Sequence, residues 1–445
     1  MTNKLKKSNN NSKRIQKLLG VEECVRYYPP NIEKIKNSEA IFRNDRDIDI
    51  YLHIPFCKTP CGFCPFNQYL YKEDEVKSYI SSVEKEIKIL GSLYNLNQLK
   101  IKTFWIGGGT PSDLSEEDLE RILKIIHKNF NLSCVEEFTI EAKPILKLFT
   151  DKKINLLHKY KVNRVSLGVQ SINQKYLKIL GRAYEPNDAI EMIKRIKKNG
   201  FILNIDMIYR LPGQTLAEVA EDVNQVKTLG IDHISWFPYI SHQGTPIEEK
   251  MNREKRLKKA DREQYFKMFN EIIKIMNREG YEQYTPYYFS KKIKCQYHIG
   301  RWQMPQRDTL GIGAGAFSFF NGWIYANAHN TKVYQEAVNN NKAPIVMGRK
   351  LNQIEKNTRL AVLGIKFFTI NFSEFEKYSG IKMNIYYQKE LGILKNLGLI
   401  KVYKDRIECT ELGKAFNNDI ATYFSANSAR QVDQPQAINL IDKGL

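Results

Sequence analysis

The sequence lacks any long apolar run. Although 42% of its 445 residues are hydrophobic, no segment approaches the roughly 20 consecutive apolar residues needed to cross a bilayer. Residues 1–19 are rich in lysine and asparagine and have no apolar centre, so they do not match a secretory signal. We therefore expect a cytoplasmic protein without a membrane span.

Cysteine is scarce and unevenly placed. Only seven cysteines are present, and three of them form one group, Cys57, Cys61 and Cys64. An odd number with a single group argues against a disulfide framework and for a reducing compartment. We interpret the four scattered cysteines as small buried apolar residues outside any site. They are Cys24, Cys134, Cys295 and Cys409.

Acidic residues are fewer than basic ones. The 69 lysines and arginines exceed the 49 aspartates and glutamates, which gives a formal net charge of +20. A nucleic-acid-binding protein can have such a charge, but here the excess is spread along expected helix faces such as 194–198 and 255–259, which is typical of solvated surfaces. We therefore expect no nucleic-acid partner. A basic rim would attract an acidic substrate or an electron donor such as flavodoxin.

The grouped cysteines have the spacing C-x3-C-x2-C and follow an apolar, strand-like run at 48–54. Pro55, Pro60 and Gly62 keep this cysteine loop irregular, so that three sulfurs can converge on one point. Soft thiolates gathered in this way bind iron or zinc.

A fourth cysteine is missing from the loop. Closed structural sites of iron or zinc usually take four protein ligands, whereas Pro65 and Phe66 follow the last cysteine here. Three ligands leave one metal position open. A zinc site completed by a distant His or Asp stays as the alternative.

Beyond the cysteine loop, apolar segments of strand length alternate with segments of helical period. Strands are expected at 48–54, 101–106, 137–141, 164–170, 202–208 and 233–239, and helices at 73–90, 145–160, 174–180, 186–199 and 216–228. Such alternation implies parallel pairing, and six units imply an α/β fold with a partial (β/α)6 barrel that binds ligands at the carboxyl ends of its strands.

Near residue 348 the pattern changes. Short helices are expected at 354–364, 372–378 and 386–397, followed by a hairpin from 400–403 and 406–410. Helices with a two-strand wing are typical of a winged-helix-like module. The predicted organisation is a polar tail and arm at 1–46, the core barrel and its extension at 47–335, a smaller C-terminal helical domain at 336–420 and a tail at 421–445.

Polar and glycine residues stand at the ends of several expected strands. A Gly-Gly-Gly-Thr-Pro-Ser turn at 107–112 follows the second strand, where glycines either let the backbone approach a ligand or make a plain tight turn. Glu141, Gln170, Arg182 and Asp206 lie at or just beyond later strand ends. Each also has a structural explanation, since an arginine can pair on the surface, an aspartate can cap a helix and a glutamine can satisfy a backbone group.

The cysteine loop, with Phe63 before its last cysteine, and the glycine turn one strand later resemble the radical S-adenosylmethionine (SAM) superfamily. The segments 165–171, 181–182, 204–209 and 211–215 resemble, in order and spacing, its HemN-like group, the oxygen-independent coproporphyrinogen III oxidases and their relatives. The resemblance runs from about residue 48 to residue 415.

This resemblance implies a [4Fe-4S] cluster on Cys57, Cys61 and Cys64 whose open iron binds SAM, and reductive cleavage of SAM to a 5′-deoxyadenosyl radical. It also implies a second SAM molecule beside the first. A carboxylate can accept hydrogen bonds from ribose hydroxyls, and an arginine can pair with the methionyl carboxylate. The implied cofactor-binding residues are Tyr51, Phe63, Gly108, Gly109, Thr110, Glu141, Gln170, Arg182 and Asp206.

The HemN-like group includes several activities. Phe66 stands where the decarboxylating oxidase usually has a further cysteine, and Tyr184 and Phe317 stand where many relatives have histidine. These differences, with the aromatic segment 280–289, suggest a pocket for a flatter, less acidic substrate, although those aromatics are equally typical of core. The favoured interpretation is a class C methyltransferase that acts on an sp2 carbon of a flat aromatic or tetrapyrrole-like substrate. The alternatives are a coproporphyrinogen III oxidase and a heme chaperone.

Overall fold

The computed structural model describes residues 47–65, 68–93, 95–254 and 261–429. Several predictions concern residues outside these ranges: the arm at 1–46 with Cys24, Phe66, the basic stretch at 255–259 and the end of the tail from 430.

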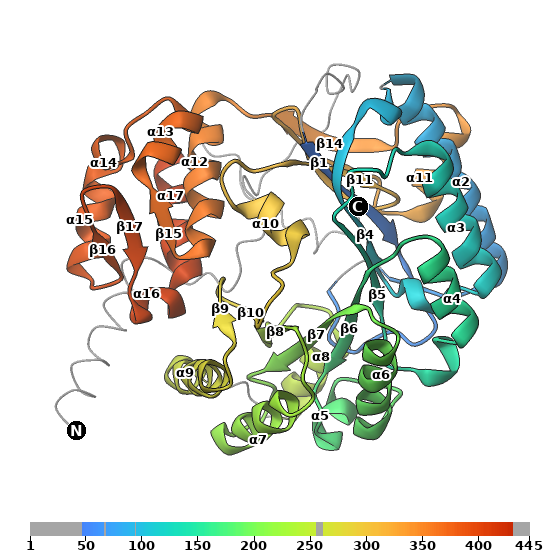
Figure 1. The fold of residues 1–445 in the computed structure, drawn as a ribbon, viewed down its shortest axis with the longest axis horizontal. Coiled ribbons are helices and arrows are strands. Elements are labelled where there is room, and N and C mark those ends of the chain that lie inside the picture. Colours follow the sequence, from blue (N-terminus) through green and yellow to red (C-terminus); the bar gives the residue numbers. More distant parts are fainter. Residues whose placement is uncertain (1–46, 66–67, 94, 255–260, 430–445) are drawn as a thin grey trace.

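Twelve strands of the described chain form one sheet, and six neighbouring strands in it run parallel in the order β1-β4-β5-β6-β7-β8. Helices cover the outer face of these strands (Figure 1). The predicted partial (β/α)6 barrel is therefore confirmed. The strands are β1 (Asp47–Ile54), β4 (Lys100–Gly108), β5 (Glu137–Ala142), β6 (Arg164–Gln170), β7 (Ile202–Tyr209) and β8 (His233–Pro238), and the helices are α2 (Glu73–Leu93), α3 (Glu116–Asn129), α4 (Asp151–Lys159), α5 (Gln174–Ile179), α6 (Pro186–Lys198) and α7 (Leu216–Lys227).

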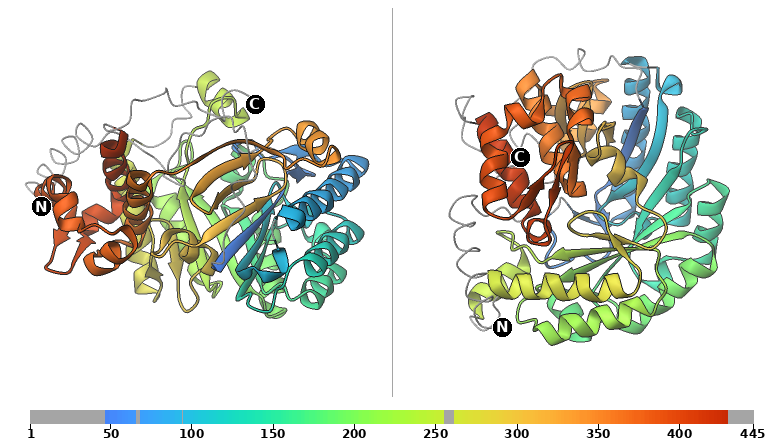
Figure 2. Two further views of the ribbon diagram at one scale, coloured as in Figure 1. Left: turned by 90° about the horizontal axis from the view of Figure 1, so that it is seen from above. Right: turned by 60° about the vertical axis from the view of Figure 1, so that its left-hand side comes forward.

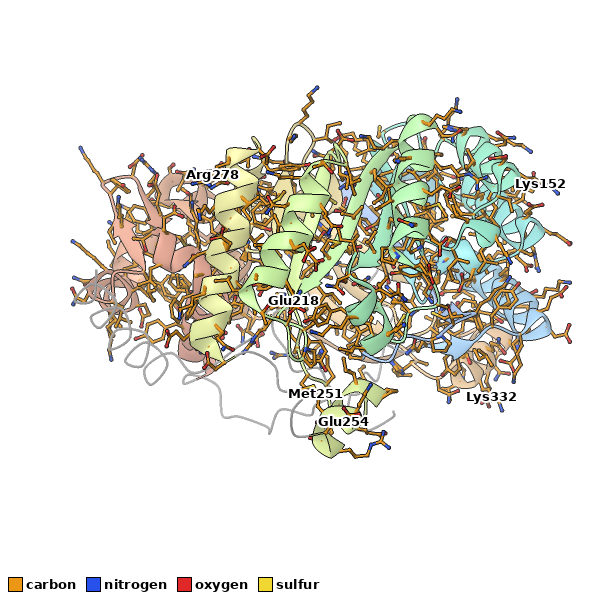
Figure 3. All side chains as sticks on the ribbon, turned by 90° about the horizontal axis from the view of Figure 1, so that it is seen from below. Lys152, Glu218, Met251, Glu254, Arg278 and Lys332 are labelled. Atoms are coloured by element: carbon orange, nitrogen blue, oxygen red, sulfur yellow. The ribbon has the colours of Figure 1, made fainter. Side chains whose placement is uncertain are left out.

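Burial of apolar side chains explains why these segments fold as they do. Ile48, Ile50, Leu52 and Ile54 lie on one face of β1, because side chains alternate along a strand, and all four are fully buried. Many lysines and arginines lie at the surface. Figure 3 shows Lys152, Arg278 and Lys332 at the periphery of the molecule. In the basic face expected at 194–198, Lys194, Lys197 and Lys198 are exposed.

Two helices around the barrel differ from expectation. Helix α3 was not predicted, although Ser115 accepts a hydrogen bond from the Asp118 amide at its start and gives a recognisable capping signal. The single helix expected at 145–160 is instead a short 3-10 turn (Leu146–Leu148) followed by α4. The break occurs because Thr150 caps α4, with its hydroxyl accepting from the Lys153 amide at 3.2 Å.

The sheet continues beyond the barrel strands on both sides. β11 pairs in parallel with β1, and three antiparallel strands follow it, while β10 and β9 extend the β8 edge. Helix α10 packs against β1, β4 and β11. The bounds are β2 (Phe56–Cys57), β3 (Tyr69–Leu70), α8 (Pro246–Arg253), α9 (Arg262–Arg278), β9 (Glu282–Gln283), β10 (Tyr288–Ser290), α10 (Gln296–Trp302), β11 (Asp308–Ile312), β12 (Phe317–Phe320), β13 (Trp323–Asn327), α11 (Thr331–Asn339) and β14 (Ile345–Lys350).

The C-terminal part forms a helical module with its own hydrophobic core, drawn in orange to red beside the barrel in Figure 2. Its expected hairpin is present and gains a third strand, β15. The elements are α12 (Gln353–Gly364), β15 (Thr369–Asn371), α13 (Phe372–Ser379), α14 (Met383–Tyr386), α15 (Gln388–Asn396), β16 (Ile400–Val402), β17 (Arg406–Cys409), α16 (Glu411–Ala415) and α17 (Asn417–Ala429).

Two expectations for this module are wrong. A tail was expected from residue 421, but this position lies inside helix α17. Ile420, Ala421 and Phe424 of this helix are fully buried in the module's core. The single helix expected at 386–397 is interrupted at the buried Tyr387, which packs on Phe424. Among the helices of the described residues, none is long and apolar enough to span a membrane.

Candidate metal and cofactor site

The cysteine loop leaves the carboxyl end of β1 and is held mainly through its backbone. Its first residues pair as β2 with β3. The Lys58 amide donates to the Asp113 carboxylate at 2.7 Å. Further along, the Gly62 amide donates to the Leu180 carbonyl at 3.1 Å, and the Gly62 carbonyl accepts from the Ile247 amide at 3.0 Å. Contacts with β3 and with three more distant parts of the chain therefore fix the loop's course.

Each of two loop sulfurs has a polar neighbour. The Cys57 sulfur is buried and lies 3.3 Å from the Thr110 hydroxyl, and burial raises the pKa of the Cys57 thiol. The Cys61 sulfur, which is half-buried like that of Cys64, accepts a hydrogen bond from Arg182 Nη1 at 2.8 Å. This contact places a cation directly against the second sulfur of the loop.

The sulfurs are not arranged around a single ion. Among the residues that the structure describes, no three His, Cys, Asp or Glu side chains are placed to hold one metal ion, and the expected role of the three cysteines as ligands of a cluster stays a prediction. An iron–sulfur cluster takes each cysteine on a different iron, and its ligands therefore stand apart. A loop of three cysteines with cationic neighbours fits such a cluster, and Cys57, Cys61 and Cys64 would hold it.

The glycine turn at 107–112 lies against the cysteine loop. The Gly109 amide donates to the Ile54 carbonyl at 2.7 Å, and the Thr110 amide donates to the Phe56 carbonyl at 2.9 Å. A Cβ on Gly109 would come within 2.7 Å of the Phe56 carbonyl oxygen, and Gly108 has a φ of +114° that side chains rarely adopt. The chain's own packing therefore requires these glycines, and the turn places Thr110 beside the first cysteine.

Glu141 and Asp206 end up in the barrel interior, as expected for residues at strand ends. Glu141 accepts hydrogen bonds from the Trp105 indole at 2.8 Å and from the Gly108 amide at 3.1 Å. Burial, with a contribution from the Asp206 carboxylate, raises the pKa of Glu141 to about 7. Asp206 accepts from Ser166 and Asn204, each at 3.0 Å, and burial raises its pKa too. Asp206 is thus an interior acceptor and not a helix cap.

Arg182 lies in the same region and does not pair on the surface. Its second Nη donates to the Gly168 carbonyl at 3.0 Å, and its guanidinium lies over the Phe63 and Tyr184 rings, 5.4 and 5.6 Å from their centroids. Gln170, at the end of β6, has a φ of +67°. The register between β6 and β7 shifts just before it, which turns the end of the strand.

The two predicted aromatic residues have different surroundings. Tyr51 lies 3.0 Å from His53 through its hydroxyl and packs against Trp105. Phe63 packs against an apolar cluster that includes Tyr176 and Leu180. The structure thus brings the cysteine loop, the glycine turn, Glu141, Arg182 and Asp206 to one end of the barrel.

Some residues of this region were not found from the sequence. Lys143 and Lys153 are buried, with 6% and 4% exposure, and both contact the loop or the glycine turn. Lysine is rarely buried, so a sequence pattern gives no signal for them. A group of stacked rings was not found either. His298 stacks on Tyr288 and Trp302 with centroids 4.3 and 5.2 Å apart and planes within 7°.

The scattered cysteines differ from expectation in part. Cys295 is fully buried and donates to Glu137 at 3.3 Å, away from the cysteine loop. Cys134 is exposed, so its expected burial is wrong, whereas Cys409 is half-buried and packs against the core of the C-terminal module. Cys134 belongs to the short turn between α3 and β5, which has little apolar surface to cover it.

Comparison with known proteins decides the family. The sequence matches the Radical SAM superfamily over residues 51–226. It is 32% identical over 380 residues to the heme chaperone HemW of Lactococcus lactis subsp. lactis, covering 84% of this chain and 96% of that protein. The chain belongs to the radical SAM superfamily and its HemN-like group. Membership implies a [4Fe-4S] cluster and SAM as cofactors.

Two further comparisons place the chain within this group. It is 28% identical over 405 residues to the oxygen-independent coproporphyrinogen III oxidase of Synechocystis sp., covering 85% of this chain and 84% of that one. The structure of the Escherichia coli coproporphyrinogen III oxidase HemN superposes with a TM-score of 0.79, at 22% identity, over 92% of this chain and 98% of that one. The HemN-like fold, with its barrel and C-terminal helical domain, is therefore confirmed.

Proposed function

We propose that this chain is a heme-binding protein that acts as a heme chaperone and carries a [4Fe-4S] cluster and SAM in its barrel. The observation that carries the proposal is the 32% identity along nearly the whole of the L. lactis heme chaperone. The Bacillus subtilis heme chaperone HemW is similar over the same share of this chain, at 28% identity. None of the relatives named above is a methyltransferase, so they favour this function over the methyl transfer that the sequence suggested.

Two residues, Tyr184 and Phe317, stand where many relatives have histidine. Their surroundings support a function other than decarboxylation of a porphyrinogen. The Tyr184 hydroxyl donates to the Gly168 and Val169 carbonyls at 3.0 and 2.7 Å, so it is committed to the backbone of β6. Phe317 packs in a small apolar cluster with Ile324 and Leu351. Neither presents a polar group for the carboxylates of a porphyrinogen.

A flat apolar ligand would find aromatic surface in the barrel. The three rings of Tyr288, His298 and Trp302 are nearly parallel, and stacked rings are a favourable surface for another planar ring system. Heme iron takes His, Cys, Met or Tyr as protein ligands. We assign this ring group as the wall against which the tetrapyrrole lies.

The cofactors would be held by residues at the carboxyl ends of the strands. Cys57, Cys61 and Cys64 hold the cluster, and the bound cluster and SAM supply one-electron chemistry. Arg182 offers a cation for a methionyl carboxylate, and Glu141 and Asp206 offer acceptors for ribose hydroxyls. Occupancy by two SAM molecules, with Gln170 between them, is part of this proposal. So is reduction by an acidic donor such as flavodoxin, attracted by the net charge of +20.

A titration with hemin tests the proposal. Protein reconstituted anaerobically with iron and sulfide is titrated with hemin, and the Soret absorbance is followed. We expect saturation at about one hemin per chain. Absence of saturable binding overturns the proposal. His298→Ala should weaken binding, whereas His158→Ala should not, because His158 stacks on Phe201 at the outside of α4. Equal hemin binding by both variants would refute the assignment of the Tyr288, His298 and Trp302 rings as the wall of the heme site, but not heme binding itself.

A coproporphyrinogen III oxidase is the second candidate, because the identity to the Synechocystis oxidase extends over most of both chains. Incubation with coproporphyrinogen III, SAM and dithionite separates it from the first. Appearance of a decarboxylated tetrapyrrole would establish the oxidase.

A further inference from the structure

Lys143 is a buried lysine that contacts the cysteine loop directly. It follows β5 two residues after Glu141, and only 6% of it is exposed. Its ammonium group donates to the Thr59 carbonyl at 2.6 Å, between the first and second cysteines. Its own backbone amide donates to the Ser112 hydroxyl at 3.2 Å. Lys143 therefore joins the end of β5 to the cysteine loop and to the glycine turn.

The polar groups around this ammonium group are themselves held by hydrogen bonds. Asp113, which is 1% exposed, has a carboxylate oxygen 4.0 Å away. The same oxygen accepts from the Lys58 amide at 2.7 Å. A second buried lysine, Lys153, contacts the glycine turn, where it donates to the Ser112 carbonyl at 2.9 Å. Of the two lysines, Lys143 is the one that contacts the cysteine loop, and Asp113 holds the same part of the loop.

Lys143 and Asp113 carry opposite charges and meet the cysteine loop at different atoms. The Lys143 ammonium group contacts the Thr59 carbonyl, between Cys57 and Cys61, whereas the Asp113 carboxylate accepts from the Lys58 amide. A buried charge is screened less by solvent than an exposed one, so the positive charge of Lys143 acts on the loop at physiological salt.

We propose that Lys143 is a positioning residue that holds the cysteine loop and sets the reduction potential of the cluster through its charge. Reduction adds one electron from an external reductant and takes the cluster core from 2+ to 1+; no bond forms or breaks. With three thiolate ligands the assembly then passes from a net charge of −1 to −2. A fixed positive charge stabilises the more negative form, because hydrogen bonds and nearby charge set cluster potentials.

Three substitutions at this position separate charge from hydrogen bonding. Lys143→Arg keeps both, Lys143→Gln keeps a donor without charge, and Lys143→Met removes both. Lys147→Met is the matched control, because Lys147 is exposed four residues further along. The full-length proteins are reconstituted without heme, and the midpoint potential is measured by dye-mediated titration with EPR detection, together with the iron content per chain.

We expect the Gln and Met variants to favour the oxidised cluster about tenfold more than the unchanged protein does. For one electron, this corresponds to a midpoint potential that is about 59 mV more negative in the variants. The Arg variant and the Lys147→Met control should keep the original potential. A Gln variant with unchanged potential would overturn the role of the charge, as would equal shifts at positions 143 and 147. If all three Lys143 variants, Arg included, fail to take up iron, the charge has no separate role and the proposal also fails.

The inference rests on the cluster that superfamily membership implies and not on heme binding. Heme is absent from the measurement, so a failed hemin titration leaves its outcome unchanged.

Discussion

The guanidinium of Arg182 donates a hydrogen bond to the sulfur of Cys61 across 2.8 Å. The two residues lie 121 positions apart in the sequence, and this contact brings a cation from beyond β6 to the metal-binding loop. Although burial lowers the pKa of Arg182, the neighbouring Tyr184 and the loop cysteines raise it overall, so the group stays charged at neutral pH.

Replacement of Arg182 should weaken SAM binding. A hydrogen bond to a charged group contributes about 1.5–3 kcal/mol, so Arg182→Met should raise the Kd for SAM by about 10- to 100-fold. Equilibrium dialysis of reconstituted protein measures this. Arg195→Met is a suitable control, since Arg195 pairs with Asp151 at the outside of the barrel. An unchanged Kd in Arg182→Met would exclude a direct contact with SAM.

Substitution of Gly109 should disturb the cysteine loop. A Cβ at this position would meet backbone atoms of Pro55 and Phe56 at 2.7–2.8 Å, and backbone cannot move aside as a flexible side chain can. We expect Gly109→Ala to take up less iron on reconstitution. Gly392→Ala serves as the comparison, because no atom lies within 4 Å of its added Cβ. Equal iron content in both variants would contradict the close packing of turn and loop.

Glu86 should make stability depend on pH. It is 1% exposed and accepts from the Gly313 amide, the Asn327 amide group and the Tyr334 hydroxyl. Burial raises its pKa from 4.5 to about 7. Between these values the folded chain holds a proton that the unfolded chain has lost, so stability falls as pH rises, by about 3 kcal/mol at most.

Comparison with Glu86→Gln isolates this contribution. The variant cannot titrate at this position, so its free energy of unfolding should fall less between pH 5 and pH 7 than that of the unchanged protein. Denaturant unfolding at several pH values measures the difference, and other buried acids cancel because both proteins contain them. Parallel pH profiles would show that Glu86 is ionised alike in the folded and unfolded states.

The end of α17 should matter for the stability of the C-terminal module. Phe424 is fully buried and packs on Tyr387, and truncation of a buried phenylalanine costs about 3–5 kcal/mol. Phe424→Ala should lower the thermal midpoint markedly. Ile385→Ala removes an apolar side chain that is 67% exposed in the same module and should change it little. Similar midpoints for the two variants would contradict the burial of α17.

The sequence predicts the barrel strands closely, because most of them carry buried apolar residues at alternate positions, as in Ile48, Ile50, Leu52 and Ile54 of β1. It does not reveal that α17 belongs to the core, since Asn417, Asn418 and Asp419 precede its buried face. These three polar residues are themselves buried, and Asn418 bonds the hydroxyl of Tyr287. Polar side chains with partners from distant segments cannot be recognised from local pattern alone.

The same limit applies to the site. The strand-end positions of Glu141 and Asp206 follow from the alternation of strands and helices. The bond from Trp105 to Glu141 and the contact of Lys143 with Thr59 join segments that are far apart in sequence. They depend on how neighbouring strands align, which periodicity does not specify.

Product analysis of one anaerobic reaction tests the proposed function most directly. Reconstituted protein is mixed with hemin, SAM and dithionite, and heme occupancy, 5′-deoxyadenosine and S-adenosylhomocysteine are quantified together. The account predicts about one bound heme per chain and no S-adenosylhomocysteine. Stoichiometric S-adenosylhomocysteine with 5′-deoxyadenosine, and no bound heme, would contradict it and indicate methyl transfer instead.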